Sequence, residues 1–150
     1  MGQISNIMND FYLYLNSQDS FDIRKNNDPS EFLIQLPKSY TLEGSWTCAV
    51  TEVSFTCDFK PRSQRLYLCG DFVQESYVRD SLLPVLRNFE IETRYKKLKH
   101  TEFVNLVRIP LTVTHLNSLR LYLKDEHLKP VQFDSNDLHC VLHFKKSWAR

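Results

Sequence analysis

His139, Cys140 and His143 are the residues whose types and spacing come nearest to a metal site. They lie in an apolar segment, 138–144, with the composition of a β-strand. On a strand the two histidines point to the same face, about 13 Å apart along the backbone, and Cys140 points to the opposite face. The three side chains are therefore poorly placed for a zinc site, and no matching pair lies elsewhere. We expect satisfied or partly exposed histidines and no metal.

A second group could support acid–base chemistry: the carboxylates Asp71, Glu75 and Asp80 share a segment with Tyr77 and Arg79. Glycoside hydrolysis needs two carboxylates held several ångströms apart around a cleft, and a sequence does not show such a separation. We interpret these side chains as solvated. The chain also contains no nucleophile elbow, phosphate-binding loop or zinc-protease motif. The prediction is that the protein is not an enzyme and uses no cofactor.

Two basic clusters, at 94–100 and 145–150, interleave lysine, arginine and histidine with Tyr95 and Trp148. Such a mixture suits contact with nucleic acid or another polyanion. The net charge is only +1, from 19 basic and 18 acidic residues, whereas a nucleic-acid-binding domain usually has a strong excess of positive charge. We therefore expect a solvated loop and a mobile tail, and no specific nucleic-acid ligand.

The four cysteines are Cys48, Cys57, Cys69 and Cys140, without a closely spaced pair among them. A chain of 150 residues can bury a sufficient core without disulfides, so reduced thiols in an intracellular protein are expected. A disulfide framework stays open as an alternative, because the number is even. Polar residues interrupt any signal peptide at the N-terminus, and no apolar run approaches the roughly 20 residues that cross a bilayer.

The elements that must position these residues are mostly strands. Aromatic residues make up 13% of the chain and there are only 3 glycines. One segment, 80–86, has a helical pattern, with Asp80 or Ser81 as its N-cap. We expect a single all-β domain over 1–150, a jelly-roll sandwich of about eight antiparallel strands with mobile ends at 1–9 and 146–150. The expected strands are 11–15, 32–36 (stopped by Pro37), 46–55, 66–70, 89–92, 103–109, 119–123 and 138–144.

The segment Tyr40–Phe55 is expected to anchor this sandwich. A tight turn at Glu43-Gly44-Ser45 leads into an extended run that opens on Trp46 and carries apolar residues on both faces, as in a strand covered on two sides. Gly44, Trp46 and Phe55 are therefore the predicted structural anchors. Glu52 is the one charge within the run, and burying it is costly unless it is paired or lies at an exposed end.

An ordered set of motifs spans nearly the whole chain. Its segments are Phe11–Leu15, Phe32 with Leu36-Pro37, Leu42-Glu43-Gly44-Ser45-Trp46, Glu52-Val53-Ser54-Phe55, Leu66–Val73, Val78–Arg87, Leu119–Asp125, Val131-Gln132-Phe133 and Leu142–Lys146. This ordered set resembles one family, the penton-type minor capsid proteins of Polinton (Maverick) elements and the related adintoviruses. Two positions depart from the family pattern. Arg79 stands where glycine is usual, and His127-Leu128 replaces a turn that normally contains glycine, so we expect altered turn geometry at both places.

The resemblance implies a virion protein: a single jelly roll that forms homopentamers at icosahedral vertices, beside a double jelly-roll major capsid protein. It also implies assembly inside the host cell, without membrane insertion. The alternatives are a minor capsid protein that is not pentameric, and a cellular β-sandwich that binds a ligand or another protein. A nucleic-acid-binding module is a further alternative.

Overall fold

The computed structural model describes residues 9–17, 31–56, 64–91, 98–131 and 138–147. These ranges contain strands and connecting segments, and within them there is no helix. The strands are β1 (Asp10–Asn16), β2 (Glu31–Thr41), β3 (Trp46–Thr56), β4 (Gln64–Gly70), β5 (Ser76–Val78), β6 (Ser81–Leu83), β7 (Val85–Ile91), β8 (Leu98–Glu102), β9 (Ile109–Pro110), β10 (His115–Asp125) and β11 (Leu138–Lys146).

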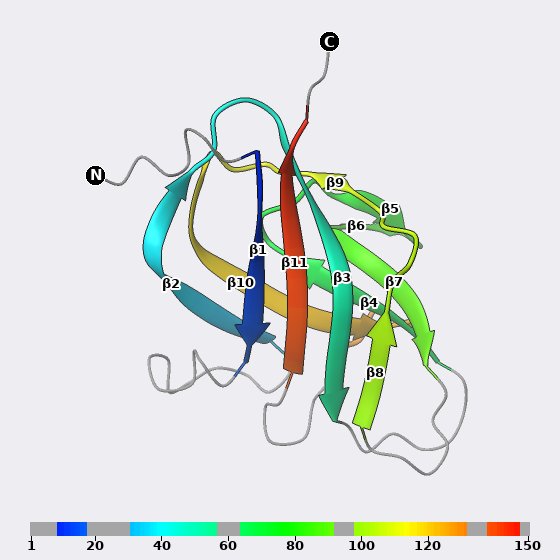
Figure 1. Cartoon of the computed structure of the whole chain (residues 1–150). Helices are drawn as coiled ribbons and strands as arrows, with labels where there is room; N and C mark the ends of the chain where they lie inside the picture. The colour runs from blue at the N-terminus through cyan, green and yellow to red at the C-terminus, as the bar shows by residue number, and fades with distance from the viewer. Residues whose placement is uncertain (1–8, 18–30, 57–63, 92–97, 132–137, 148–150) are drawn as a thin grey trace.

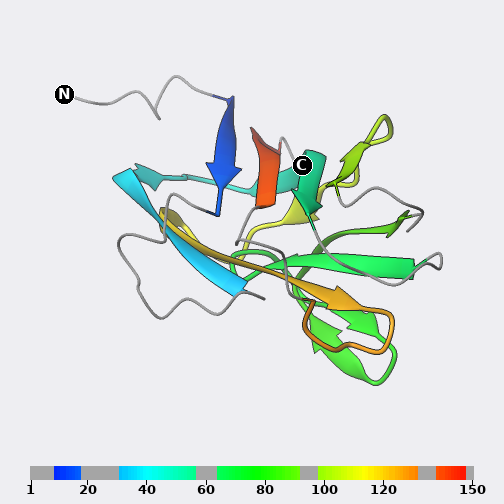
Figure 2. The ribbon, with the colours of Figure 1, turned by 90° about the horizontal axis from the view of Figure 1, so that it is seen from below.

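Eight of these strands form two facing antiparallel sheets, in the orders β1-β11-β3-β8 and β2-β10-β4-β7. Figure 1 shows the first sheet in front of the second, and Figure 2, seen from below, shows the two sheets as separate layers. The pairs β1·β11, β2·β10, β3·β8 and β4·β7 are nested, so that the chain resembles one long hairpin wrapped around a core. This is the jelly-roll arrangement, as the sequence predicts. The short β9 extends the first sheet against β3, and β5 and β6 form a separate hairpin.

The core lies between the two sheets and follows from alternation along the strands. In β1 the side chains of Phe11, Leu13 and Leu15 are buried, and those between them are more exposed. A period of two is what a strand needs to place one set of side chains inside and the other outside. Along β10, Leu119, Leu121 and Leu123 are likewise completely buried.

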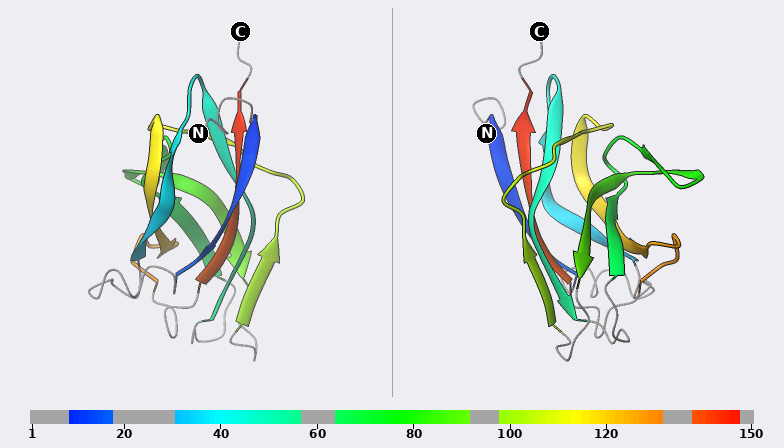
Figure 3. Two further views of the ribbon diagram at one scale, coloured as in Figure 1. Left: turned by 60° about the vertical axis from the view of Figure 1, so that its left-hand side comes forward. Right: turned by 90° about the vertical axis from the view of Figure 1, so that its right-hand side faces the viewer.

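The segment β3 is covered on both of its faces at its beginning, as predicted. Cys48, Ala49 and Val50 are consecutive and each has no exposed surface. Cys48 and Val50 face the core, so Ala49 faces outward and must be covered by something else. Figure 3 shows the segment between β8 and β9 passing over this outer face.

The prediction that Pro37 stops the second strand was wrong. β2 continues through it to Thr41, but its pairing with β10 is irregular there. Gln35 pairs with Ser118 and Tyr40 with Leu116, so four residues of β2 stand against one of β10. Proline cannot donate a ladder hydrogen bond, and it is tolerated because β2 is an edge strand with this irregularity.

The predicted helix at 80–86 was also wrong. Asp80 lies in the turn of the β5–β6 hairpin, and the next residues belong to β6 and β7. Pro84 separates the two strands, and its carbonyl accepts a hydrogen bond from the Gly70 amide at 3.0 Å. Val85 and Leu86 are buried against β4, and this tertiary pairing outweighs a short local helical pattern.

The predicted strand at 103–109 is mostly a connecting segment, with only Ile109 inside β9. The sequence also missed the strand β8 just before it. Phe103 packs edge-on against Phe89, with ring centroids 5.7 Å apart, and the guanidinium carbon of Arg87 lies over the Phe103 ring, 4.3 Å from its centroid. These contacts, together with a hydrogen bond from the Phe103 amide to the Thr51 carbonyl, fix the start of this connecting segment. The segment does not continue the strand β8.

Arg79 and Leu128 are the non-glycine residues with positive φ, +54° and +64°, among those described. They occupy the two turns where the resemblance leads us to expect glycine. Both therefore keep the left-handed backbone that glycine favours, which argues against the altered turn geometry that we expected. Gly44 shares this conformation, with φ +86°.

The described residues at the two ends of the chain make backbone hydrogen bonds. The Lys146 amide bonds to the Asn9 carbonyl at 2.8 Å, and the Ser147 amide to the Ser45 carbonyl at 2.6 Å. Mobility of the ends at 1–9 and 146–150 stays a prediction, and residues 1–8 and 148–150 lie outside the described residues. Cys48, Cys69 and Cys140 are buried and form no disulfide within the described residues, and Cys57 is outside the described ranges.

Candidate functional site

A row of side chains crosses the outer face of the sheet β1-β11-β3-β8. Tyr12 pairs with His143, and His143 pairs with Ala49 of the next strand. Ile109 of β9 pairs with Cys48 of β3, and the two strands run antiparallel. Arg108, one residue before Ile109, therefore lies beside Ala49 and extends the same row. Because alanine ends at Cβ, it leaves room for the arginine side chain to reach across β3 and contact the histidine.

The histidine in this row is held by hydrogen bonds on both ring nitrogens. Its Nδ1 lies 2.6 Å from an Arg108 nitrogen, and its Nε2 lies 2.9 Å from a carboxylate oxygen of Asp10. Arginine can only donate, so Nδ1 accepts and the proton of a neutral ring sits on Nε2, directed at Asp10. The Tyr12 ring stacks on the imidazole at 4.4 Å between centroids. This Asp10–His143–Arg108 chain fastens the β8–β9 segment to the opposite edge of the sheet.

One nitrogen of the Arg108 guanidinium makes no hydrogen bond within the described residues. This nitrogen, Nη1, is buried. An unpaired donor in such a place has a cost, so the Arg108 side chain is positioned at the expense of part of its hydrogen bonding. We assign it a structural role in holding the segment.

Two exposed apolar patches lie at opposite edges of this same sheet. The tyrosine patch consists of Tyr12 and Tyr14 on the edge strand β1, which are 49% and 74% exposed and stack on each other. The loop patch consists of Val104, Leu106 and Val107, between β8 and β9 at the other edge, with Val104 91% exposed. Exposed apolar groups gathered in this way often mark an interaction surface.

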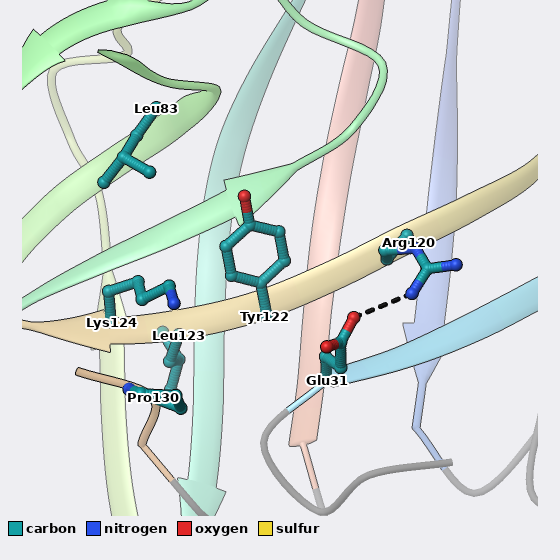
Figure 4. Close-up of a pocket in the computed structure, with 7 residues that line it drawn as sticks. All are labelled: Glu31, Leu83, Arg120, Tyr122, Leu123, Lys124 and Pro130. Carbon is teal, nitrogen blue, oxygen red and sulfur yellow. Dashed lines mark hydrogen bonds and ion pairs between the residues drawn. The ribbon is translucent and has the colours of Figure 1, made fainter. Parts of the chain in front are cut away.

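The second sheet carries a pocket of about 350 Å³ on its outer side. Figure 4 shows Arg120, Tyr122 and Lys124 along β10, with Leu83 of β6 facing the Tyr122 ring. Its volume falls in the range of roughly 300–1,000 Å³ that small-molecule sites occupy. The lining residues are Glu31, Leu83, Arg120, Tyr122, Leu123, Lys124 and Pro130.

The polar groups of this pocket are already paired with one another. Arg120 donates to Glu31 at 2.8 Å, and this bond raises the pKa of the guanidinium. The Lys124 ammonium lies over the Tyr122 ring, 5.6 Å from its centroid. Burial, followed by the neighbouring Cys69, raises the pKa of the Tyr122 hydroxyl, while burial raises that of the Cys69 thiol to about 12. Both groups therefore stay protonated at neutral pH, and neither is an activated nucleophile.

The sequence prediction for the histidines of β11 is confirmed. His139 is exposed and lies 3.1 Å from the Asn16 amide, and His143 is buried and hydrogen-bonded as described above. Cys140 faces the core on the opposite side of the strand. The three side chains do not converge.

The predicted acid–base group is spread along an exposed segment. Asp71 accepts a hydrogen bond from the Arg120 amide at 3.1 Å, and Glu75 and Asp80 are exposed. Tyr77 is 75% exposed on the β5–β6 hairpin, and Arg79 donates to the Glu126 carbonyl. None of these five residues lines the pocket.

The predicted anchors are placed as expected in the turn and at the ends of β3. Trp46 is 5% exposed, and its Nε1 donates to the Glu43 carbonyl at 2.9 Å. Gly44 occupies the left-handed turn between them, and Phe55 is buried near the far end of the strand. Of the two basic clusters, 94–97 and 148–150 lie outside the described residues, while His100 and Lys145 are exposed.

Reasoning from the sequence did not foresee the groups that the sheet brings together. Glu52 was singled out as a costly charge, and it lies directly opposite Glu102 of β8, with His100 on the same side. A strand predicted at 98–102 would have placed His100 and Glu102 on one face, but it would not have placed them opposite Glu52. Asp10 and Arg108 gave no local signal of their contact with His143.

Within the described part of the chain no helix is long and apolar enough to span a membrane. Comparison with known protein families and with curated proteins finds no match to this chain.

Proposed function

We propose that this protein is a penton-like minor capsid subunit, which forms homopentamers at the vertices of an icosahedral capsid beside a double jelly-roll major capsid protein. The observation that carries the proposal is the left-handed backbone at Arg79 and Leu128. In both turns the resemblance leads us to expect glycine, and both turns keep the conformation that glycine favours. A side chain in that conformation costs about 1–2 kcal/mol, and two turns that keep it at this cost support the resemblance.

The nested strand order supports the same proposal, because a single jelly roll is what the penton-type resemblance implies. The described residues offer no group of side chains arranged as in the familiar hydrolase sites, and the pocket's polar groups are engaged with one another. A structural role therefore fits the described part of the molecule better than a catalytic one.

The two apolar patches indicate how subunits would meet. A ring of identical subunits is built from heterologous contacts, in which one patch of each subunit meets a different patch of the next. The tyrosine patch and the loop patch differ from each other: one lies on the edge strand β1, and the other lies in the segment between β8 and β9. This placement suits a head-to-tail ring in which Tyr14 of one subunit packs against Val104 of the next.

The experiment is the solution mass of the purified chain by size-exclusion chromatography with light scattering over a range of concentration. We expect a closed species of five times 17.8 kDa. Tyr14→Arg and Val104→Asp should each abolish it without unfolding the chain, since both side chains are mostly exposed. Tyr77→Arg is the matched control, because Tyr77 is a tyrosine of equal exposure outside both patches.

Mixing the two patch variants gives a sharper result. Tyr14→Arg keeps an intact loop patch, and Val104→Asp keeps an intact tyrosine patch, so a mixture should form a dimer of one of each and grow no further. A mixture that stays monomeric, or single variants that still form rings, would contradict the assignment of these patches.

The pocket on the second sheet favours one other function, a β-sandwich that binds a small ligand. That function predicts a protein of constant mass at every concentration, indifferent to Tyr14→Arg and Val104→Asp. Lys124→Ala would then weaken the binding of this ligand, because Lys124 lines the pocket. The mass measurement therefore separates the two functions.

A further inference from the structure

Glu52 and Glu102 face each other directly across the β3–β8 pair. Their neighbours Val53 and Phe55 point into the core, so both carboxylates lie on the outer face of the sheet. Like charges placed directly opposite on adjacent strands destabilise a sheet. None of the described lysines or arginines is hydrogen-bonded or ion-paired with Glu52, which leaves the repulsion uncompensated by the described basic residues.

His100 completes the group. It lies two residues before Glu102 in β8 and pairs with Ser54, so its ring is on the same face. One ligand atom from each of Glu52, His100 and Glu102 lies within 4.8 Å of the other two. The described ranges hold one such convergence of histidine, cysteine, aspartate or glutamate side chains.

The distances fit a metal ion with little movement. Bonds of about 2.0–2.2 Å in a tetrahedral site place neighbouring ligand atoms about 3.3–3.6 Å apart. The His100 Nε2 already lies 3.5 Å from a carboxylate oxygen of Glu102. Glu52 needs only to rotate its flexible side chain toward this pair, while the backbones of β3 and β8 stay fixed by their ladder.

The donor set also indicates the kind of metal. One imidazole nitrogen with two carboxylate oxygens suits zinc and its first-row neighbours, whereas calcium takes six to eight oxygens. The side chains of His100 and Glu102 are 47% and 72% exposed, so the remaining coordination position opens to solvent. We propose that Glu52, His100 and Glu102 form a binding site for a divalent transition-metal ion, with Zn²⁺ as the preferred occupant.

The site is independent of the proposed ring, because neither apolar patch contributes a ligand. A cation between Glu52 and Glu102 would convert a repulsive cross-strand pair into a link between β3 and the edge strand β8. Occupancy should therefore stabilise the sheet edge whether or not the chain forms pentamers.

The test is titration of the tag-free chain with zinc chloride, by calorimetry and by thermal unfolding, in a Cys57→Ser background that removes the thiol lying outside the described residues. We expect one ion per chain and a higher melting temperature. Glu52→Gln and His100→Ala should each weaken binding about tenfold or more, since even changes to groups behind metal ligands cost about 10–100-fold. His127→Ala is the matched control, because His127 lies 3.8 Å from the single carboxylate of Glu126 and has no second acidic ligand.

A second measurement tests the repulsion itself. Without metal, Glu102→Gln should melt above the unsubstituted chain, because one of the two facing charges is gone, and its melting temperature should no longer respond to zinc. Absence of binding at 1:1 stoichiometry, equal affinity in Glu52→Gln and in the control, or a metal-free Glu102→Gln that melts lower would each overturn the proposal.

Discussion

Truncation of Trp46 is the most direct test of how β3 is anchored. The side chain is 5% exposed and lies at the start of the strand, with its ring centroid 5.7 Å from that of Phe11 in β1. A buried tryptophan removes roughly 150–250 Å² from water, which at about 25 cal/mol per Å² corresponds to about 4–6 kcal/mol. Measured Trp→Ala changes of this kind cost about 3–5 kcal/mol. We therefore expect Trp46→Ala to lower the free energy of unfolding by about 4 kcal/mol.

A companion variant separates packing from hydrogen bonding. Trp46→Phe keeps most of the ring volume but loses the Nε1 hydrogen bond to the Glu43 carbonyl at 2.9 Å, a bond that contributes about 0.5–1.5 kcal/mol. Glu43 is exposed, so water can replace the lost donor. The expected cost is about 1–2 kcal/mol.

The assay is urea unfolding followed by far-UV circular dichroism at 25 °C. Tryptophan emission is unsuitable, since one of the chain's two tryptophans is removed. Tyr77→Ala is the control, because Tyr77 is a mostly exposed aromatic residue outside both apolar patches and should change stability by less than about 0.5 kcal/mol. If Trp46→Ala unfolded within 1 kcal/mol of the unsubstituted chain, roughly the noise of such a series, Trp46 would not anchor the core.

Four further changes have defined outcomes. Gly44→Ala places a side chain at φ +86° and should cost about 1–2 kcal/mol in urea unfolding. Leu128→Gly should be more stable than Leu128→Ala by about 0.5–1 kcal/mol, because glycine relieves the left-handed strain that alanine keeps, and equal stabilities would count against that strain. Arg108→Met should cost about 1–3 kcal/mol because it leaves the buried Nδ1 of His143 without its donor, and imidazole NMR should report a changed Nδ1 resonance. Burial raises the pKa of the Cys140 thiol from 9.0 to about 12, so the folded state disfavours the thiolate; its contribution to stability is complete below pH 9 and is lost as the pH rises toward 12. The stability difference between the unsubstituted chain and Cys140→Ala should accordingly shrink by up to about 1.4 kcal/mol per pH unit above pH 9, and a constant difference in urea unfolding would exclude the effect.

The Asp10–His143–Arg108 chain has a mechanical consequence for the proposed ring. It joins β1, which carries the tyrosine patch, to the segment that carries the loop patch. Both patches are therefore held on one rigid face. Preorganised surfaces lose less conformational freedom when they associate, which favours a ring between subunits of this kind.

The sequence by itself determined the class of the fold and much of the core. Alternation of apolar and polar residues is local, so segments such as 11–15 and 119–123 could be placed as strands with one buried face. The burial of both faces at the beginning of β3 could be predicted for the same reason, because the residues on both faces are apolar. The isolated charge of Glu52 could be recognised as a problem without any knowledge of its partner.

Local patterns failed where distant contacts decide the outcome. The pairing of β7 with β4 outweighs the helical pattern at 80–86. The apolar run at 103–109 is a connecting segment because Phe103 packs against Phe89 and Arg108 contacts His143. Proline at 37 is compatible with a strand only because that strand lies at the edge of its sheet and is irregular there.

The candidate sites belong entirely to the tertiary structure. Glu52 meets Glu102 and His100 across a strand pair closed by a long connection, and Arg108 reaches His143 over an alanine on the strand between them. Register is set by the packing of the whole sandwich, and a shift of one residue would turn each of these side chains to the other face. The sequence therefore specified which residues are buried in a strand, and only the folded sheet decided which charged side chains face one another.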